Sequence, residues 1–208
     1  MTSARTQTWS GYRESIGDRS PLFAAMVSEW GISTALYPGC YLDLSPSTAI
    51  DDVTYVDNDA RAARYFATEG LAESELGAAP ASTARRIAFI AADYTTSLPI
   101  AQGSVDLIIS LYAGPVWDHC RPYLAPGGLL LANTSHGDAS VAALDPDLEL
   151  VAAVHHRDGR YRIERAELDA YLHPKSAVPV DAESIRRSGR GVAYTKTAFA
   201  YVFQLRQR

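Results

Sequence analysis

Apolar positions along this chain fall into two spacings, one typical of buried strands and the other of helices. Short runs of branched and aromatic residues mark the predicted buried strands. These runs cover residues 33–37, 53–57, 86–93, 105–114 and 127–135. The segments predicted to be helical include residues 20–30, 60–70 and 116–124. Strands and helices that alternate in this way predict an α/β fold, a doubly wound and mostly parallel sheet with helices on both faces.

The pattern changes after residue 148. Two strand-like stretches within residues 148–165 flank Asp158-Gly159, a dipeptide that favours the tight turn of a β-hairpin. A short helix is predicted over residues 167–172, and residues 195–205 read as a strong closing strand. With residues 160–191 taken as an insert before the last strand, we expect a seven-stranded sheet.

Length and composition fit one globular domain over residues 1–208, of which 47% are hydrophobic. A polar segment at 1–19 precedes the first helix, and residues 160–191 form an insert before the last strand. The formal net charge of −5 disfavours nucleic acid and anionic membranes as partners.

Localisation is predicted from what the sequence lacks. The first residues have no apolar signal core, and no apolar run approaches the ~20 residues of a membrane-spanning helix. Cys40 and Cys120 lie far apart and match no disulfide or zinc spacing. We expect a soluble, cytoplasmic protein without a metal site, and the sequence leaves open whether it forms a homodimer.

Candidate site residues stand where the predicted strands end. In an open parallel sheet, ligands bind beyond the carboxyl ends of the strands, where the strand order reverses. The ends of the first four strands carry Tyr37-Pro38-Gly39, Asp57-Asn58-Asp59, Asp93-Tyr94 and the stretch from Ser110 to Gly114.

Two of these ends carry acids with a ligand reading and a structural reading. Asp57 follows Gly39 at about the 20-residue spacing at which an acid accepts hydrogen bonds from a ribose diol. Alternatively, Asp57 or Asp59 caps the next helix. Asp93 and Tyr94 can contact the edge and face of an adenine, or Asp93 can simply form a turn.

The turn after the first strand has a single glycine. Gly39 allows the backbone to approach a ligand closely, or it serves only as a turn glycine after proline. A loop with one glycine cannot easily wrap a pyrophosphate, which disfavours NAD and FAD. A ligand without phosphate between its sugar and its reactive end tolerates the change better.

Taken in order, these motifs resemble those of the class I S-adenosylmethionine-dependent methyltransferases. The matching stretches are ALYPG, VTYVDND, AADY, DLIISLYAG and LAPGGLLLAN, within residues 22–155. The resemblance implies that the closing strand lies antiparallel to the others. This chain departs from the family pattern in the first motif, where Gly39 stands alone and Tyr41 and Leu42 occupy places where small residues are expected.

The resemblance also implies a role for each strand end. Tyr37, Pro38 and Gly39 would line the methionine end of S-adenosylmethionine, Asp57 would hold the ribose, and Asn58 would flank the adenine. Asp59, beside them, is a further candidate for cofactor binding. Asp93 and Tyr94 would contact the adenine. Ser110, Leu111 and Tyr112 would border the opening for methyl transfer.

Methyl transfer needs alignment, exclusion of water and, for some acceptors, a base. Three side chains at or beyond strand ends are candidates for that catalytic role: Tyr112, His119 and His136. Consecutive residues of a strand point to opposite faces, so His155 and His156 cannot bind one metal together in a regular strand.

Two functions follow as hypotheses. The first is a methyltransferase that uses S-adenosylmethionine on a small-molecule acceptor. The second is a methyltransferase-like fold without catalysis that serves as a binding or assembly module. Bulky Tyr41 and Leu42 decide between them, because their side chains can fill the place of the cofactor.

Overall fold

A computed structural model describes residues 8–77, 85–176 and 181–207. Its strands are β1 (Thr34–Pro38), β2 (Asp52–Asp57), β3 (Arg86–Ala91), β4 (Val105–Ser110), β5 (Leu124–Ala132), β6 (Leu148–Arg157), β7 (Arg160–Glu164) and β8 (Ala200–Leu205). Its helices are α1 (Trp9–Ile16), α2 (Ser20–Trp30), α3 (Ala60–Phe66), α4 (Leu71–Leu76), α5 (Val116–Cys120), α6 (Asp138–Ala142) and α7 (Ala182–Ser188). Short 3-10 turns are η1 (Ser45–Thr48), η2 (Arg121–Tyr123) and η3 (Leu168–Ala170).

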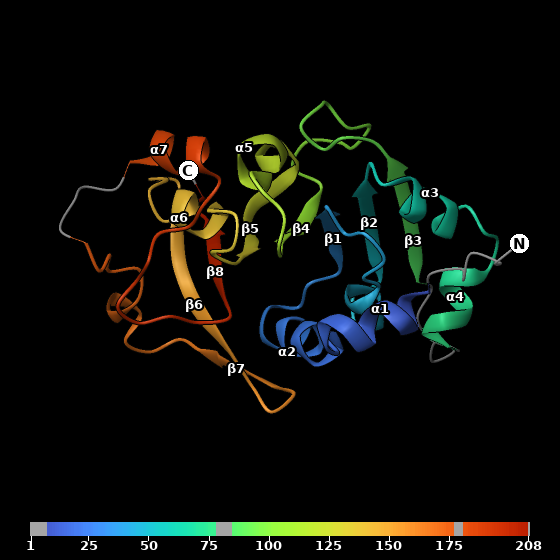
Figure 1. Cartoon of the computed structure of the whole chain (residues 1–208), viewed down its shortest axis with the longest axis horizontal. Coiled ribbons are helices and arrows are strands. Elements are labelled where there is room, and N and C mark those ends of the chain that lie inside the picture. Colours follow the sequence, from blue (N-terminus) through green and yellow to red (C-terminus); the bar gives the residue numbers. More distant parts are fainter. Residues whose placement is uncertain (1–7, 78–84, 177–180, 208) are drawn as a thin grey trace, which may run out of the picture.

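The strands form one eight-stranded sheet in the order β3-β2-β1-β4-β5-β8-β6-β7 (Figure 1). The pairs among β1 to β5 are parallel, and β8 lies antiparallel to both β5 and β6. This arrangement confirms the doubly wound α/β sheet with an antiparallel last strand. The sheet has eight strands rather than seven, because part of the predicted insert, residues 160–164, pairs with β6 as β7.

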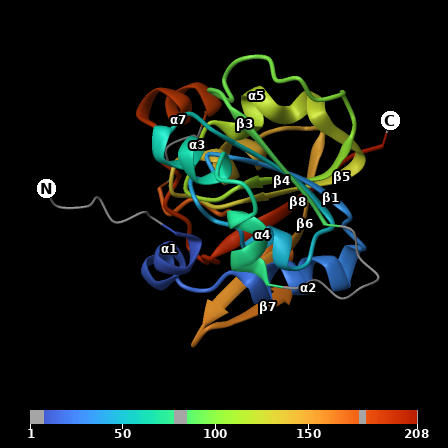
Figure 2. The same ribbon diagram turned by 90° about the vertical axis from the view of Figure 1, so that its right-hand side faces the viewer.

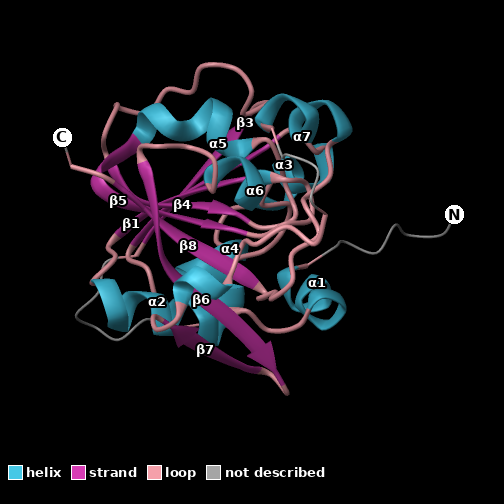
Figure 3. Cartoon of the chain, turned by 90° about the vertical axis from the view of Figure 1, so that its left-hand side faces the viewer, coloured by secondary structure: helices cyan, strands magenta, loops and turns pink. Residues whose placement is uncertain are grey.

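Helices cover both faces of the sheet, with α2 below the strands and α5 above them in Figures 2 and 3. Side chains of β1 show why its apolar run is continuous. Ala35 and Tyr37 belong to the core between the sheet and α2, whereas Leu36 belongs to the core between the sheet and α5. A strand buried on both faces has no reason to alternate apolar with polar residues.

The hairpin predicted at Asp158-Gly159 joins β6 to β7. Both turn residues have positive φ, 51° at Asp158 and 72° at Gly159. Positive φ at both central positions is the geometry of a type I′ turn, which matches the twist of the two strands. The hairpin extends from the sheet at the edge where β1 and β4 also end.

Several predicted boundaries differ from the structure. Residues 60–70 form α3 and then a turn rather than one helix, because Gly70, at φ 69°, separates α3 from α4. The segment predicted as a helix over 167–172 is the short turn η3. No helix among the described residues combines the length and apolar character needed to cross a membrane.

Candidate active site

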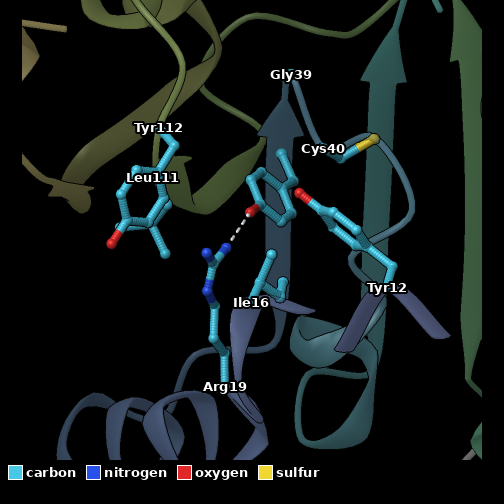
Figure 4. A pocket seen from close by; sticks show the side chains of 8 residues that line it. Tyr12, Ile16, Arg19, Gly39, Cys40, Leu111 and Tyr112 are labelled. Atoms are coloured by element: carbon cyan, nitrogen blue, oxygen red, sulfur yellow. Dashed lines mark hydrogen bonds between the residues drawn. The ribbon is translucent and has the colours of Figure 1, made fainter. Parts of the chain in front are cut away.

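A hollow of about 270 Å³ opens at the carboxyl ends of β1 and β4. The strand order reverses between these two neighbours, so this is the switch point at which open α/β sheets bind ligands. Its walls come from three places in the chain: Tyr12, Ile16 and Arg19 at the N-terminal helices, Tyr37, Gly39 and Cys40 after β1, and Leu111 and Tyr112 after β4. Figure 4 shows Arg19 reaching into the hollow between Tyr112 and Tyr12.

A buried charge pair joins Arg19, which lines the hollow, to Asp43. Arg19 Nη1 donates to Asp43 Oδ2 at 3.0 Å, and the Tyr37 hydroxyl donates to the same oxygen at 3.2 Å. Arg19 is 5% exposed and Asp43 is fully buried. Burial raises the pKa of Tyr37 well above its usual value, so this hydroxyl keeps its proton. Burial alone would lower the pKa of Arg19, but Tyr37 and Asp43 together raise it.

Two tyrosines near the hollow have a strained backbone. Tyr41 and Tyr112 have φ values of 47° and 61°, a backbone region that residues other than glycine rarely adopt. Tyr112 is held by a hydrogen bond from its amide to Asn133 Oδ1 and by its ring, 4.9 Å from the Arg19 guanidinium carbon. Its side chain is nevertheless 51% exposed. Strain of this kind concentrates at functional sites, at a cost of about 1–3 kcal/mol per residue.

Gly39 is required by its own backbone geometry. Its φ is 65°, and its amide donates to the Val56 carbonyl at 2.8 Å. A Cβ atom placed on Gly39 would lie 2.7 Å from the Ala113 Cβ and 3.6 Å from the Tyr94 ring. The glycine thus brings the end of β1 against the loop after β4. Pro38 precedes it as the buried last residue of β1.

Asp57 closes β2 as predicted, but its carboxylate already binds the protein's own chain. Oδ2 accepts from the Tyr41 amide at 2.7 Å, and Oδ1 accepts from the Asp59 amide at 2.8 Å. A carboxylate has about four acceptor positions, so these bonds use two of them. Asp57 is 9% exposed and does not line the hollow described above.

The bulky residues of the degenerate motif take two different positions. Leu42 is fully buried in the core between the sheet and α2. The Tyr41 ring packs edge-on against Tyr12 at 4.9 Å and lies 5.1 Å from the Arg61 guanidinium carbon. Tyr41 therefore bridges α1 and α3 beside the end of β2.

The remaining residues after β2 have structural partners or face solvent. Asp59 caps α3 by accepting from the Arg61 amide at 2.7 Å and forms an ion pair with the Arg61 guanidinium. Hydrogen bonds from Arg61 lower the pKa of Asp59 to about 2. Asn58 is exposed beside it.

The acid after β3 forms a turn, whereas its aromatic neighbour reaches toward the site. Asp93 is exposed and accepts from the amide and hydroxyl of Thr95 at 2.9 and 2.8 Å. The Tyr94 hydroxyl donates to the Gly114 carbonyl at 3.2 Å. Tyr94 thus ties the loop after β3 to the loop after β4, next to Gly39.

The end of β4 is fixed by a buried acid that sequence reasoning missed. Ser110 donates its hydroxyl to Asp138 Oδ2 at 2.5 Å, and the same carboxylate accepts from the amides of Val116 and Trp117. Burial raises the pKa of Asp138, and the hydrogen bonds from Ser110 and Trp117 oppose that rise. Asp138 thereby positions Leu111, which lines the hollow.

His119 and His136 are both exposed and do not line the hollow. His136 lies against Gly114, where an added Cβ would come within 2.9 Å of the His136 Cβ. Hydrogen bonds from Thr95 lower the pKa of Asp93, and the nearby His119 on α5 adds a smaller lowering contribution. Of the three candidate bases, Tyr112 alone borders the hollow.

The structure thus brings Tyr37, Gly39, Leu111 and Tyr112 together at one hollow. Its lining does not include Asp57, Asp93, His119 or His136. Reasoning from strand ends missed Tyr12, Arg19 and Asp43. Arg19 and Tyr12 belong to a segment that precedes the sheet, so no strand-end rule finds them. A buried acid four residues after Gly39, within an apolar stretch, was a readable signal of a charge partner.

No protein-family model matches the sequence, and no curated protein matches it significantly. Solved structures do resemble it. A methyltransferase from Geobacter sulfurreducens is similar over 96% of this chain and 87% of its own, with a TM-score of 0.52 and 11% identity. The N-methyltransferase NodS from Bradyrhizobium japonicum is similar over 96% and 97% of the two chains, with a TM-score of 0.49 and 13% identity.

An S-adenosylmethionine-dependent methyltransferase from Mesorhizobium loti is similar over 91% of this chain and 99% of its own, with a TM-score of 0.42 and 16% identity. Identities this low show a shared fold alone. Of these three overlays, the one on the Geobacter structure exceeds a TM-score of 0.5 and supports the shared architecture.

Proposed function

We propose that this chain, whose fold is that of the class I S-adenosylmethionine-dependent methyltransferases, transfers a methyl group to a small-molecule acceptor. The observation that carries the proposal is the hollow at the switch point between β1 and β4. Tyr112, strained and half-exposed at its edge, supports a functional use of that hollow.

The residues for the cofactor are those at the strand ends. Tyr37, Pro38 and Gly39 would border its methionine end, and Asp57 would bind the ribose with its two unused acceptor positions. Asn58 and Asp59 would flank the nucleoside, Asp93 and Tyr94 the adenine, and Ser110 and Leu111 the methyl-transfer side. S-adenosylmethionine, when bound, supplies an electrophilic methyl group.

The hollow is smaller than the ~300–1,000 Å³ typical of ligand pockets. It therefore suits the methyl-transfer end and the acceptor atom, with the adenosyl part lying toward Asp57 and Tyr94. The residues around the hollow would have to align the acceptor's lone pair with that methyl group and exclude water from both. A proton lost by the acceptor passes to a base, for which Tyr112 is the candidate in contact with the hollow.

A second function is favoured by a specific contact. The Tyr41 amide donates to Asp57, and Leu42 is part of the core. The protein's own contacts therefore fix the loop at Tyr41 and Leu42. A methyltransferase-like module without catalysis would have this arrangement. The two functions differ in whether the loop at Tyr41 and Leu42 moves to admit a cofactor.

A crystal structure with S-adenosylhomocysteine distinguishes them. The enzyme proposal predicts density that reaches from Gly39 to Asp57, with the ribose hydroxyls on the Asp57 carboxylate. Crystals soaked at millimolar concentration that show the Tyr41 loop unmoved and no nucleoside density would favour the non-catalytic module.

A further inference from the structure

Arg19 lines the candidate active site with one edge of its guanidinium group unused. Its Nη1 donates to Asp43 at 3.0 Å and to the Tyr37 hydroxyl at 3.4 Å. In the part of the chain that the structure describes, no hydrogen bond or ion pair involves Nε or Nη2 of Arg19. Figure 4 shows the second terminal nitrogen turned away from Tyr37, on the side of Tyr112.

The unused edge has no route to bulk solvent other than the hollow. Arg19 is 5% exposed, and it lines the hollow. Asp43 does not need this edge, because its carboxylate also accepts from the Tyr37 hydroxyl at 3.2 Å and from the Ser45 amide at 3.0 Å. Buried donors without partners are unfavourable, so the edge favours a ligand that accepts from both nitrogens.

A second donor points into the same space. Figure 4 shows the hydroxyl of Tyr12 directed into the hollow, and this hydroxyl has no hydrogen-bond partner within residues 8–77, 85–176 and 181–207. Burial raises the pKa of Tyr12 by more than the nearby Arg19 lowers it, so the hydroxyl keeps its proton and can donate. The hollow therefore has donors for an oxyanion from two side chains.

A carboxylate fits these donors best. Its two oxygens match the parallel N–H groups of an arginine edge, which bind such a group in a bidentate manner. The volume of about 270 Å³ suits a small group of this kind. A phosphate dianion would bring twice the charge close to the buried Asp43 carboxylate, to which Arg19 is already bound.

We propose that the methyl acceptor carries a carboxylate, which binds the Nε–Nη2 edge of Arg19 and the Tyr12 hydroxyl. The direction of the edge favours the acceptor over the cofactor. Nη1 faces Tyr37, at the methionine end of the proposed cofactor site, whereas the unused edge lies on the side of Tyr112, the candidate base. The word acceptor rests on the proposed function, but the carboxylate site does not.

The test measures binding of acetate and of the neutral acetamide to the full chain at low ionic strength, from amide chemical shifts and without cofactor. We expect acetate to bind at least about tenfold more tightly than acetamide, because charge-assisted hydrogen bonds distinguish the two. The shifts should centre on Arg19, Gly39 and Leu111. Equal binding, no saturation, or shifts confined to other parts of the chain would overturn the inference.

Two variants remove the donors separately. Arg19→Lys keeps a cation for Asp43 but lacks the two-nitrogen edge, and it should weaken acetate binding at least about tenfold. Tyr12→Phe removes one hydroxyl and should weaken it about three- to tenfold. Arg186→Lys, the control, makes the same change in the ion pair with Asp118 that joins α7 to α5, and it should bind acetate as the unchanged protein does.

Melting curves establish that each variant folds. Acetate binding in Arg19→Lys as tight as in the unchanged protein would overturn the inference. If Arg19→Lys does not melt cooperatively, Tyr12→Phe decides the question, and unchanged acetate binding in that variant would overturn it.

Titration with S-adenosylhomocysteine, with and without saturating acetate, separates this inference from the proposed function. We expect the same affinity in both titrations, because an acceptor and the cofactor occupy the site together. Mutual exclusion would assign the Arg19 edge to the amino-acid carboxylate of the cofactor and overturn the acceptor class alone, as would S-adenosylhomocysteine binding without acetate binding. Acetate binding without S-adenosylhomocysteine binding would overturn the methyltransferase proposal and leave a carboxylate site.

Discussion

At the scale of single residues, Gly39 and Gly31 allow the cost of a steric clash to be measured apart from the cost of a positive φ. Gly31 has nearly the same φ, 66° against 65°, but an added Cβ at Gly31 meets no atom within 4 Å. Gly39→Ala should therefore lose more unfolding free energy than Gly31→Ala, by about 1–2 kcal/mol for the clash with Ala113. Urea denaturation measures both.

The compensating variant checks the cause of that difference. Ala113→Gly combined with Gly39→Ala should recover most of the extra loss, because it removes the atom that the new Cβ meets. Equal losses in Gly39→Ala and Gly31→Ala would mean that the close approach of β1 and the loop after β4 is not made in solution.

The Arg19–Asp43 pair gives a second prediction at this scale. Either Arg19→Met or Asp43→Leu leaves a buried, unpaired charge and should cost about 3 kcal/mol of unfolding free energy. The double variant should lose clearly less than the sum of the two. The same cycle on the exposed pair Asp59–Arg61 serves as the control and should show much weaker coupling. Additive losses at Arg19 and Asp43 would contradict the pairing.

At the scale of elements, one acid holds α1 against α4 beside the hollow. Glu75 accepts from the amides of Trp9 and Ser10 and from the hydroxyls of Ser10 and Tyr65. Burial alone would raise the pKa of Glu75, but the hydrogen bonds from Ser10 and Tyr65 outweigh it and lower the pKa. This contribution to stability is complete above the unfolded-state pKa of about 4.5 and is lost as the pH falls through the folded-state value.

Glu75→Gln should therefore cost about 1 kcal/mol at neutral pH and reduce the loss of stability on acidification. It should also speed amide hydrogen exchange in α1, which carries Tyr12 and Ile16 of the hollow. Glu73→Gln, an exposed change on the same helix, is the matched control. If the two variants showed the same exchange in α1, Glu75 would not anchor it.

Elements were predictable from sequence where local chemistry decides them. The run of β4 reveals a strand buried on both faces, and Asp158-Gly159 reveals the hairpin, because only their own residues matter. The turn η1 between β1 and β2 was not predictable. Leu42 and Ile50 flank it as buried core residues, and their burial depends on packing in the core between the sheet and α2.

At the scale of the whole molecule, the ends of the predicted strands identify only those site residues that the sheet itself supplies. Tyr37, Gly39, Leu111 and Tyr112 meet in one hollow because β1 and β4 are neighbours at the switch point. Arg19 and Tyr12 complete that hollow from helices that precede the sheet. Asp57 ends the correct strand, yet the hydrogen bond from the Tyr41 amide arises from a loop conformation with positive φ that no pattern reveals.

The most direct test of the central claim is a calorimetric titration of the purified chain with S-adenosylmethionine and S-adenosylhomocysteine. We predict micromolar binding that Asp57→Ala weakens at least about tenfold, since a ribose would lose a charged acceptor. Asp51→Ala, just before the opposite end of the same strand, should bind as the unchanged protein does. A flat titration with a protein that melts cooperatively would contradict the account and leave a methyltransferase fold without its cofactor.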